Sequence, residues 1–224
     1  NRILTDRLST LLFCPSPNAV KQLIEEGFNK FNNRIEMVGD IMFDSLKLVE
    51  SKFQNLIDNS EPFTLCTLHR EENTNNESRL VKIFNALNSI ADEITLKIPL
   101  HPRTKNKLNS INFNLNPKIK IITPLSYIDF IIAIQNCDIV ISDSGGIQKE
   151  AYFLKKNCIV LRDETEWTEL VENRNNVLVG SETSKILNAY YCRNDLNKDF
   201  TIPFYGNGNT AENIIHFLLN YSFE

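Results

Sequence analysis

The sequence is poor in residues that bind metals or form disulfide bonds. Its 224 residues include three histidines and five cysteines, and no two cysteines form a C-x-x-C pair. A disulfide framework or a zinc site is therefore not expected, and no metal or other cofactor is predicted. The cysteines lie in or beside apolar runs, so we interpret most of them as buried free thiols.

Long apolar runs and an excess of positive charge are also absent. No stretch approaches the roughly 20 apolar residues that cross a bilayer, and the first residues do not resemble a signal peptide. The 24 basic and 28 acidic residues give a net charge of -4. Neither a membrane nor a nucleic acid is an expected partner, and the protein is predicted to be cytoplasmic. Because the chain starts without Met inside a helical pattern, we expect a fragment.

The sequence does contain short β-rich runs that alternate with amphipathic segments. This pattern is typical of a parallel sheet wrapped by helices, so we predict an α/β fold with a Rossmann-like, doubly wound sheet. The seven predicted strands are residues 34–38, 63–68, 95–99, 118–122, 138–142, 157–161 and 176–179.

Several of the predicted helices have clear start signals. The predicted caps are Ser16 for residues 18–26, Asp40 for residues 41–57, Ser126 with Asp129 for the helix after them, and Asn209 with Glu212 for the last helix.

The segment ISDSGGIQKE at residues 141–150 is the most informative part of the chain. It places a hydroxyl and two glycines where a buried strand turns into a helix, and unpaired N–H groups at a helix N-terminus attract anions. Ser144, Gly145 and Gly146 could thus bind phosphate, or form a serine cap with glycines chosen for backbone freedom. Glu150 could accept hydrogen bonds from a ribose diol or simply complement the helix dipole, whereas Lys149 is expected to face solvent.

Polar residues also follow two other predicted strands. His69 and Arg70 come after residues 63–68, and His101 and Arg103 come after residues 95–99. In an open α/β sheet, ligands bind beyond the carboxyl ends of the strands. His69 could neutralise a diphosphate with Arg70 or serve as an acid or base, although a histidine after a strand can also be purely structural.

Six segments follow one another along the chain: TLHREEN at 67–73, His101-Pro102, SDSGGIQKE at 142–150, LRDETE at 161–166, Val179-Gly180 and YGNG at 205–208. Taken in this order, they resemble the signatures of the non-hydrolysing UDP-N-acetylglucosamine 2-epimerases. The similarity runs through nearly the whole chain. Each element is a moderate signal, and their common order and spacing make a strong one.

The resemblance implies the C-terminal half of a GT-B-type fold, in which two Rossmann-like domains face a cleft. Residues 1–15 would be a remnant of the N-terminal domain, residues 16–205 the UDP-binding domain, and residues 206–224 a helix crossing back. Most acid and base groups would belong to the missing part, so the fragment is expected to be inactive. The family also implies a homodimer when full length.

The resemblance also implies roles for individual residues in a 2-epimerase that eliminates and re-adds UDP. His69 would be catalytic. UDP or substrate would be bound by Arg70, Glu72, His101, Ser144, Gly145, Gly146 and Glu150.

One departure bears on the substrate. Members specific for UDP-N-acetylglucosamine commonly have Thr-Glu-Arg-Pro-Glu where this chain has Thr165-Glu166-Trp167-Thr168-Glu169. The tryptophan form is similar to relatives acting on UDP-diacetamido-uronic acids in O-antigen or capsule synthesis. Two further hypotheses are a GT-B glycosyltransferase and a catalytically silent UDP-binding module.

Overall fold

The computed structural model describes residues 2–53 and 61–222, and it divides into two compact units. Unit 1 comprises Asn1–Gln54 with Thr201–Glu224, and unit 2 comprises Asn55–Phe200. This division differs from the expected boundaries at residues 15/16 and 205/206. Residues 16–53 belong to unit 1 because their helices and strand pack with the first strand and the last helix of the chain.

Unit 2 contains a six-stranded parallel sheet with the order β5-β4-β3-β6-β7-β8. Its strands are β3 (Phe63–Thr67), β4 (Thr95–Pro99), β5 (Ile119–Ile122), β6 (Val140–Ser142), β7 (Cys158–Val160) and β8 (Asn176–Leu178). Numbered from β3, this is the 3-2-1-4-5-6 order of a Rossmann fold, so the predicted doubly wound sheet is confirmed. The chain reverses its direction across the sheet between β3 and β6.

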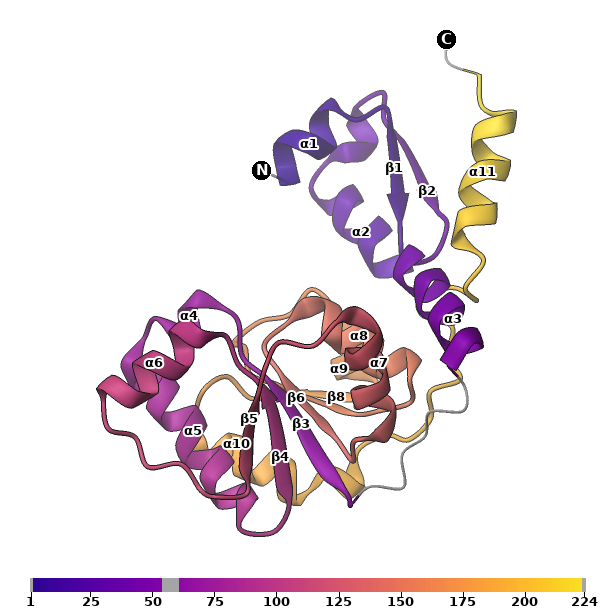
Figure 1. The fold of residues 1–224 in the computed structure, drawn as a ribbon. Coiled ribbons are helices and arrows are strands. Elements are labelled where there is room, and N and C mark those ends of the chain that lie inside the picture. Colours follow the sequence, from indigo (N-terminus) through magenta and orange to yellow (C-terminus); the bar gives the residue numbers. More distant parts are fainter. Residues whose placement is uncertain (1, 54–60, 223–224) are drawn as a thin grey trace. The chain divides into compact units, whose positions relative to one another are not determined.

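Helices cover both faces of this sheet (Figure 1). One face carries α5 (Glu77–Ala91), α6 (Pro102–Ser110) and α10 (Thr183–Tyr191), and the other carries α7 (Tyr127–Asn136), α8 (Gly145–Phe153) and α9 (Thr168–Glu172). Leu80, Phe84 and Leu87 recur at helical spacing on α5 and are fully buried. Every residue of β3, β6 and β7 is buried, as expected for central strands covered on both faces.

Unit 1 contains a two-stranded parallel sheet of β1 (Leu11–Cys14) and β2 (Arg34–Met37). The prediction that residues 34–38 join the large sheet was therefore wrong, because their backbone pairs with β1. The remaining elements are α1 (Arg2–Leu8), α2 (Pro17–Glu25), η1 (Phe28–Lys30), α3 (Ile41–Phe53) and α11 (Thr210–Asn220).

Three of the four predicted caps are confirmed. The side chains of Ser16, Asp40 and Ser126 accept hydrogen bonds from backbone N–H groups in the first turns of α2, α3 and α7. The predicted end of α3, residues 54–57, lies outside the described residues.

The cap of α11 is different from the predicted one. Asn209 makes no side-chain cap; instead the carboxylate of Asp44 in α3 accepts from the N–H groups of Thr210 at 3.0 Å and Ala211 at 2.7 Å.

The expectation of free thiols is confirmed: all five cysteines are unpaired, and four of them are buried while Cys192 is exposed. Within residues 2–53 and 61–222, no helix is long and apolar enough to cross a membrane.

Candidate functional site

Polar residues meet at the carboxyl edge of unit 2, where β3 and β6 lie side by side. Thr67, the last residue of β3, is in register with Ser142, the last residue of β6. The chain leaves β3 through His69 and Arg70 into α4 (Glu71–Thr74), and it leaves β6 through Asp143 into α8. This is the position where open α/β sheets bind ligands.

The buried carboxylate of Asp143 joins the two loops. It accepts hydrogen bonds from the backbone N–H groups of His69 at 3.0 Å and Arg70 at 3.0 Å, and from the side-chain amide of Asn73 at 3.1 Å. The same amide donates to the carbonyl of Leu161 after β7 at 2.9 Å. The backbone of the His69 loop is therefore fixed, while the His69 side chain is exposed.

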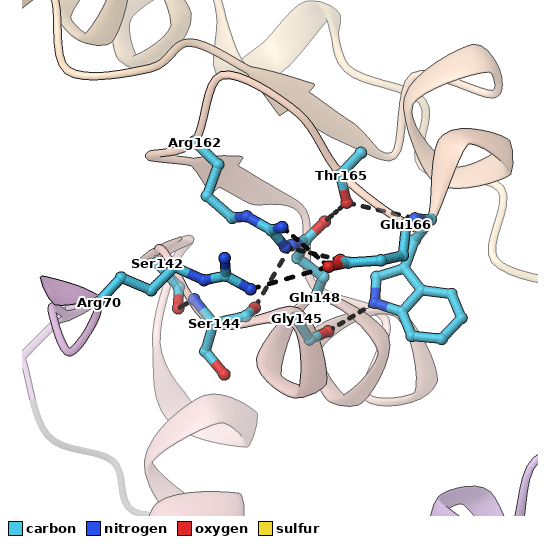
Figure 2. Close-up of polar contacts among 9 residues, drawn as sticks. Arg70, Ser142, Ser144, Gly145, Gln148, Arg162, Thr165 and Glu166 are labelled. Atoms are coloured by element: carbon cyan, nitrogen blue, oxygen red, sulfur yellow. Dashed lines mark hydrogen bonds and ion pairs between the residues drawn. The ribbon is translucent and has the colours of Figure 1, made fainter. Parts of the chain in front are cut away.

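The turn into α8 leaves its first N–H groups open. The Ser142 hydroxyl pairs with Thr67 at 2.7 Å and accepts from the N–H of Ser144 at 3.0 Å. Ser144 is the N-cap of α8, yet its side chain makes no capping hydrogen bond, and its hydroxyl is turned away from the surrounding contacts (Figure 2). Ser144, Gly145 and Gly146 are all half-buried.

Backbone conformation does not require glycine at the start of α8. Gly145 and Gly146 are helical residues and are absent from the positions with positive φ. A Cβ atom on Gly145 would meet its nearest neighbour, Glu166 Oε2, at 3.5 Å, which is an ordinary contact distance. A left-handed backbone conformation is therefore not the reason for either glycine.

A charged cluster lies beside the α8 N-terminus (Figure 2). Arg162, which follows β7 and is almost fully buried, donates two hydrogen bonds to Glu166 at 2.6 and 2.9 Å. Arg70 approaches the same carboxylate at 3.8 Å. The hydrogen bond from Arg162 lowers the pKa of Glu166 to about 2 and raises the pKa of Arg162.

The loop after β7 also contacts α8 directly. The indole Nε1 of Trp167 donates to the Gly145 carbonyl at 2.9 Å, and the Thr165 hydroxyl donates to Gln148 Oε1 at 2.7 Å. Lys149 is 6% exposed, with its Nζ 4.1 Å from the centre of the Trp167 ring. The expectation that Lys149 faces solvent was therefore wrong: its ammonium group packs on an aromatic face.

Glu150 lies further along α8 and is buried. It pairs with Tyr127 at the start of α7, whose pKa is raised to about 12 by burial and then by the charge of Glu150 and a hydrogen bond to it. The carboxylate thus already has a hydrogen-bonding partner in the protein.

His101 and Glu72 lie on two other helices that follow strands of the large sheet, α6 and α4. His101 is the N-cap of α6, where its Nδ1 accepts from the N–H of Arg103 at 3.2 Å. Arg103 itself contacts Asn75. Glu72 is exposed in α4, and its charge contributes to the raised pKa of Arg162 after the larger effect of Glu166.

Sequence reasoning missed Asp143, Asn73, Arg162 and the role of Thr165. The strand-end rule could have indicated both Asp143 and Arg162, since Asp143 directly follows β6 and Arg162 lies two residues after β7. No group of three or more His, Cys, Asp or Glu residues suited to a metal occurs in the part of the chain that the structure describes.

The strand order and the glycine turn at the switch point define a Rossmann-like α/β protein. The sequence profile of UDP-N-acetylglucosamine 2-epimerase matches residues 1–219. The chain therefore belongs to the UDP-N-acetylglucosamine 2-epimerase family.

Individual relatives agree with this membership. The chain is 39% identical to the UDP-2,3-diacetamido-2,3-dideoxy-D-glucuronate 2-epimerase of Pseudomonas aeruginosa over 97% of this chain and 62% of that protein. It is 36% identical to the UDP-N-acetylglucosamine 2-epimerase of Methanocaldococcus jannaschii over 97% and 63%. The chain thus spans less than two thirds of these relatives.

A solved structure confirms the fold class. The crystal structure of the Methanocaldococcus jannaschii UDP-GlcNAc 2-epimerase in complex with UDP-GlcNAc and UDP matches with a TM-score of 0.85 and 35% identity, covering 99% of this chain and 64% of that one. The expected GT-B-type, Rossmann-like architecture is thereby confirmed.

Proposed function

We propose that the protein containing this chain is a non-hydrolysing UDP-N-acetylglucosamine 2-epimerase, which interconverts UDP-GlcNAc and UDP-ManNAc, and that this chain holds UDP. The observation that carries the proposal is the open N-terminus of α8, with its two glycines, beside His69 and Arg70 at the switch point of the sheet. Family membership supports the reaction type.

The diphosphate would bind at the first turn of α8. The N–H groups of Gly145 and Gly146 and the Ser144 hydroxyl supply donors, and Arg70 supplies a positive charge. Arg70 is only 3.8 Å from Glu166, a distance at which a half-exposed ion pair is weak, so the arginine can exchange this partner for a phosphate at low cost.

The remaining binding roles are proposed from the resemblance to the family. Glu150 would accept hydrogen bonds from the ribose diol, with Tyr127 orienting its carboxylate. Glu72 of α4, which follows β3, and His101 at the N-terminus of α6, which follows β4, would approach the substrate. His69, which has a fixed backbone and an exposed imidazole, would act as an acid or base near the reacting sugar.

In the proposed reaction the proton on C2 is removed and the bond from C1 to the diphosphate oxygen breaks, giving UDP and a glycal. UDP then re-adds at C1 while a proton is delivered to the opposite face of C2. Preorganised donors aimed at the leaving diphosphate lower this barrier, and removal of one such donor costs about 3 kcal/mol. We propose that the 224 residues alone bind UDP without turnover.

A second substrate is favoured by one specific observation. Trp167, which lies next to the α8 turn, stands where members specific for UDP-N-acetylglucosamine commonly have an arginine. The Pseudomonas aeruginosa relative named for UDP-2,3-diacetamido-2,3-dideoxy-D-glucuronate is 39% identical. The alternative substrate is therefore that uronate.

Homodimer formation and a cytoplasmic location are part of the proposal, and light scattering of the full-length protein tests the first.

Incubation of full-length protein with UDP-GlcNAc in D2O, followed by NMR, tests the reaction. We expect deuterium at C2 and a manno product. Turnover of the diacetamido-uronate alone would move the assignment to the alternative substrate, and failure with both would reject the epimerase proposal.

Titration calorimetry with UDP tests the site. Ser144→Ala and Glu150→Ala are each expected to weaken UDP binding, with exposed Glu172→Gln as the control. Unchanged affinity in Glu150→Ala would reject the ribose assignment, and unchanged affinity in Ser144→Ala would reject the phosphate contact.

A further inference from the structure

We propose that Thr165 and Trp167 are positioning residues that aim the N–H groups of Gly145 and Gly146 at a diphosphate. The inference rests on the proposed function and concerns the loop after β7, which reaches the glycines from the neighbouring strand. Figure 2 shows this loop against the first turn of α8.

The first hydrogen bond fixes the orientation of the peptide group between Gly145 and Gly146. A peptide group is planar and trans, so its C=O and N–H point in opposite directions. Trp167 Nε1 donates to the Gly145 carbonyl at 2.9 Å. Fixing this carbonyl therefore fixes the direction of the Gly146 N–H, toward the open end of the helix.

A second set of hydrogen bonds fixes the preceding peptide group, between Ser144 and Gly145. The side-chain amide of the fully buried Gln148 donates to the Ser144 carbonyl at 3.4 Å, and the Thr165 hydroxyl donates to the other end of that amide at 2.7 Å. The N–H on the peptide group after Ser144 belongs to Gly145. Thr165 thus orients the Gly145 N–H through Gln148, more weakly than Trp167 orients that of Gly146.

These hydrogen bonds restrict the backbone of Gly145 and Gly146, because two consecutive glycines have the greatest backbone freedom of any residue pair. The Ser144 side chain does not cap the helix. The loop has hydrogen bonds of its own: the Thr165 hydroxyl accepts from the N–H of Trp167 at 3.2 Å, and Glu166 between these two residues accepts from Arg162. Preorganised N–H donors bind an anion without an ordering cost at the moment of binding.

The test compares UDP with uridine, because uridine lacks the diphosphate that the two N–H groups would bind. Trp167→Phe keeps an aromatic ring for Lys149 but removes the indole N–H, and Thr165→Val removes the hydroxyl. Thr183→Val is the matched control, since its hydroxyl donates to the carbonyl of Lys82, an interaction separate from the first turn of α8. Affinities for both ligands are measured by calorimetry, together with the thermal unfolding midpoint.

We expect Trp167→Phe to weaken UDP binding about fivefold and Thr165→Val about threefold, as for the loss of one net hydrogen bond, with uridine affinity unchanged. Thr183→Val should leave the ratio of the two affinities unchanged. An unchanged ratio in both test variants, or equal weakening of UDP and uridine, would overturn the inference and leave the proposed function standing.

A different result identifies failure of the proposed function itself. If the wild-type protein binds UDP no more tightly than uridine, no diphosphate site exists and both proposals fall. If Trp167→Phe does not fold, Thr165→Val decides the question, because it acts on the second peptide group without altering the tryptophan.

Discussion

The carboxylate of Asp143 accepts a hydrogen bond from the backbone N–H of His69 at 3.0 Å, although the two residues are 74 positions apart in the chain. This contact ties the loop after β3 to the loop after β6. Because the carboxylate is fully buried and serves three donors, its removal leaves several buried polar groups unpaired.

Asp143→Ala is therefore expected to lower the free energy of unfolding by about 3 kcal/mol, since each unsatisfied buried donor costs about 1 kcal/mol or more. Urea denaturation measures this loss. Asp195→Ala, on an exposed aspartate of the same unit, should stay within about 0.5 kcal/mol of wild type. Equal stability of the two variants would contradict the role of Asp143 as a buried acceptor.

Gly145→Ala should separate stability from ligand binding. A Cβ fits at ordinary contact distances, and alanine favours a helix over glycine by about 0.5 to 1 kcal/mol, so stability should be retained or raised. The same methyl group would stand beside the N–H groups proposed to bind phosphate, so UDP affinity should fall. Thermal unfolding and calorimetry with UDP measure the two effects.

Gly180→Ala is the matched comparison for that variant. Gly180 has φ of +66°, and its Cβ would lie 2.5 Å from Asp163 Oδ1. Alanine here adopts a left-handed conformation that costs about 1 to 2 kcal/mol, so this variant should be less stable than wild type. A stable Gly180→Ala together with an unstable Gly145→Ala would reverse the interpretation of both glycines.

Glu166 should contribute to stability only above strongly acidic pH. Its pKa in the folded protein is about 2, below its ordinary value of 4.5, because the ionised form pairs with Arg162. The contribution is complete above about pH 4.5 and disappears as pH falls toward 2. The Glu166 side chain is 53% exposed, so solvent screening limits the contribution to about 1 kcal/mol.

Urea denaturation of wild type and Glu166→Gln between pH 7 and 2 checks this expectation. The wild type should be more stable at neutral pH, and the difference should vanish at the acidic end. A difference that is constant over the whole range would show that the ionised carboxylate is not its source.

Native-state thiol titration should find one reactive cysteine. Cys192 is exposed, whereas burial raises the pKa of Cys14 to about 11 and that of Cys137 to about 12 and also raises the pKa values of Cys66 and Cys158. Only the thiolate reacts. A disulfide reagent should therefore modify one thiol in the folded protein and five in urea, and Cys192→Ser should abolish the fast phase.

The features that could be predicted from the sequence are those determined by residues close together in the chain. Strand ends, the glycine turn and the caps at Ser16 and Ser126 all follow from local patterns, and the parallel sheet follows from the alternation of strands with helices. Contacts between distant segments were not predictable in this way. Asp44 replaces Asn209 as the cap of α11 across 166 residues, and β2 pairs with β1 outside the large sheet.

The sequence correctly placed His69, Arg70 and the glycine turn after the ends of strands. It did not reveal that Thr165 and Trp167 contact the first turn of α8. Lys149 illustrates the reason: its charge predicts a solvent-facing side chain, whereas Trp167 reaches its buried ammonium group from another loop.

Trp167 is the only tryptophan in the chain, and its indole nitrogen lies 2.9 Å from the first carbonyl of α8. The fluorescence of the protein therefore arises next to the turn where a diphosphate would bind, with no label required. A ligand that rearranges this turn should change the tryptophan emission directly, so a stopped-flow instrument could follow its arrival in real time.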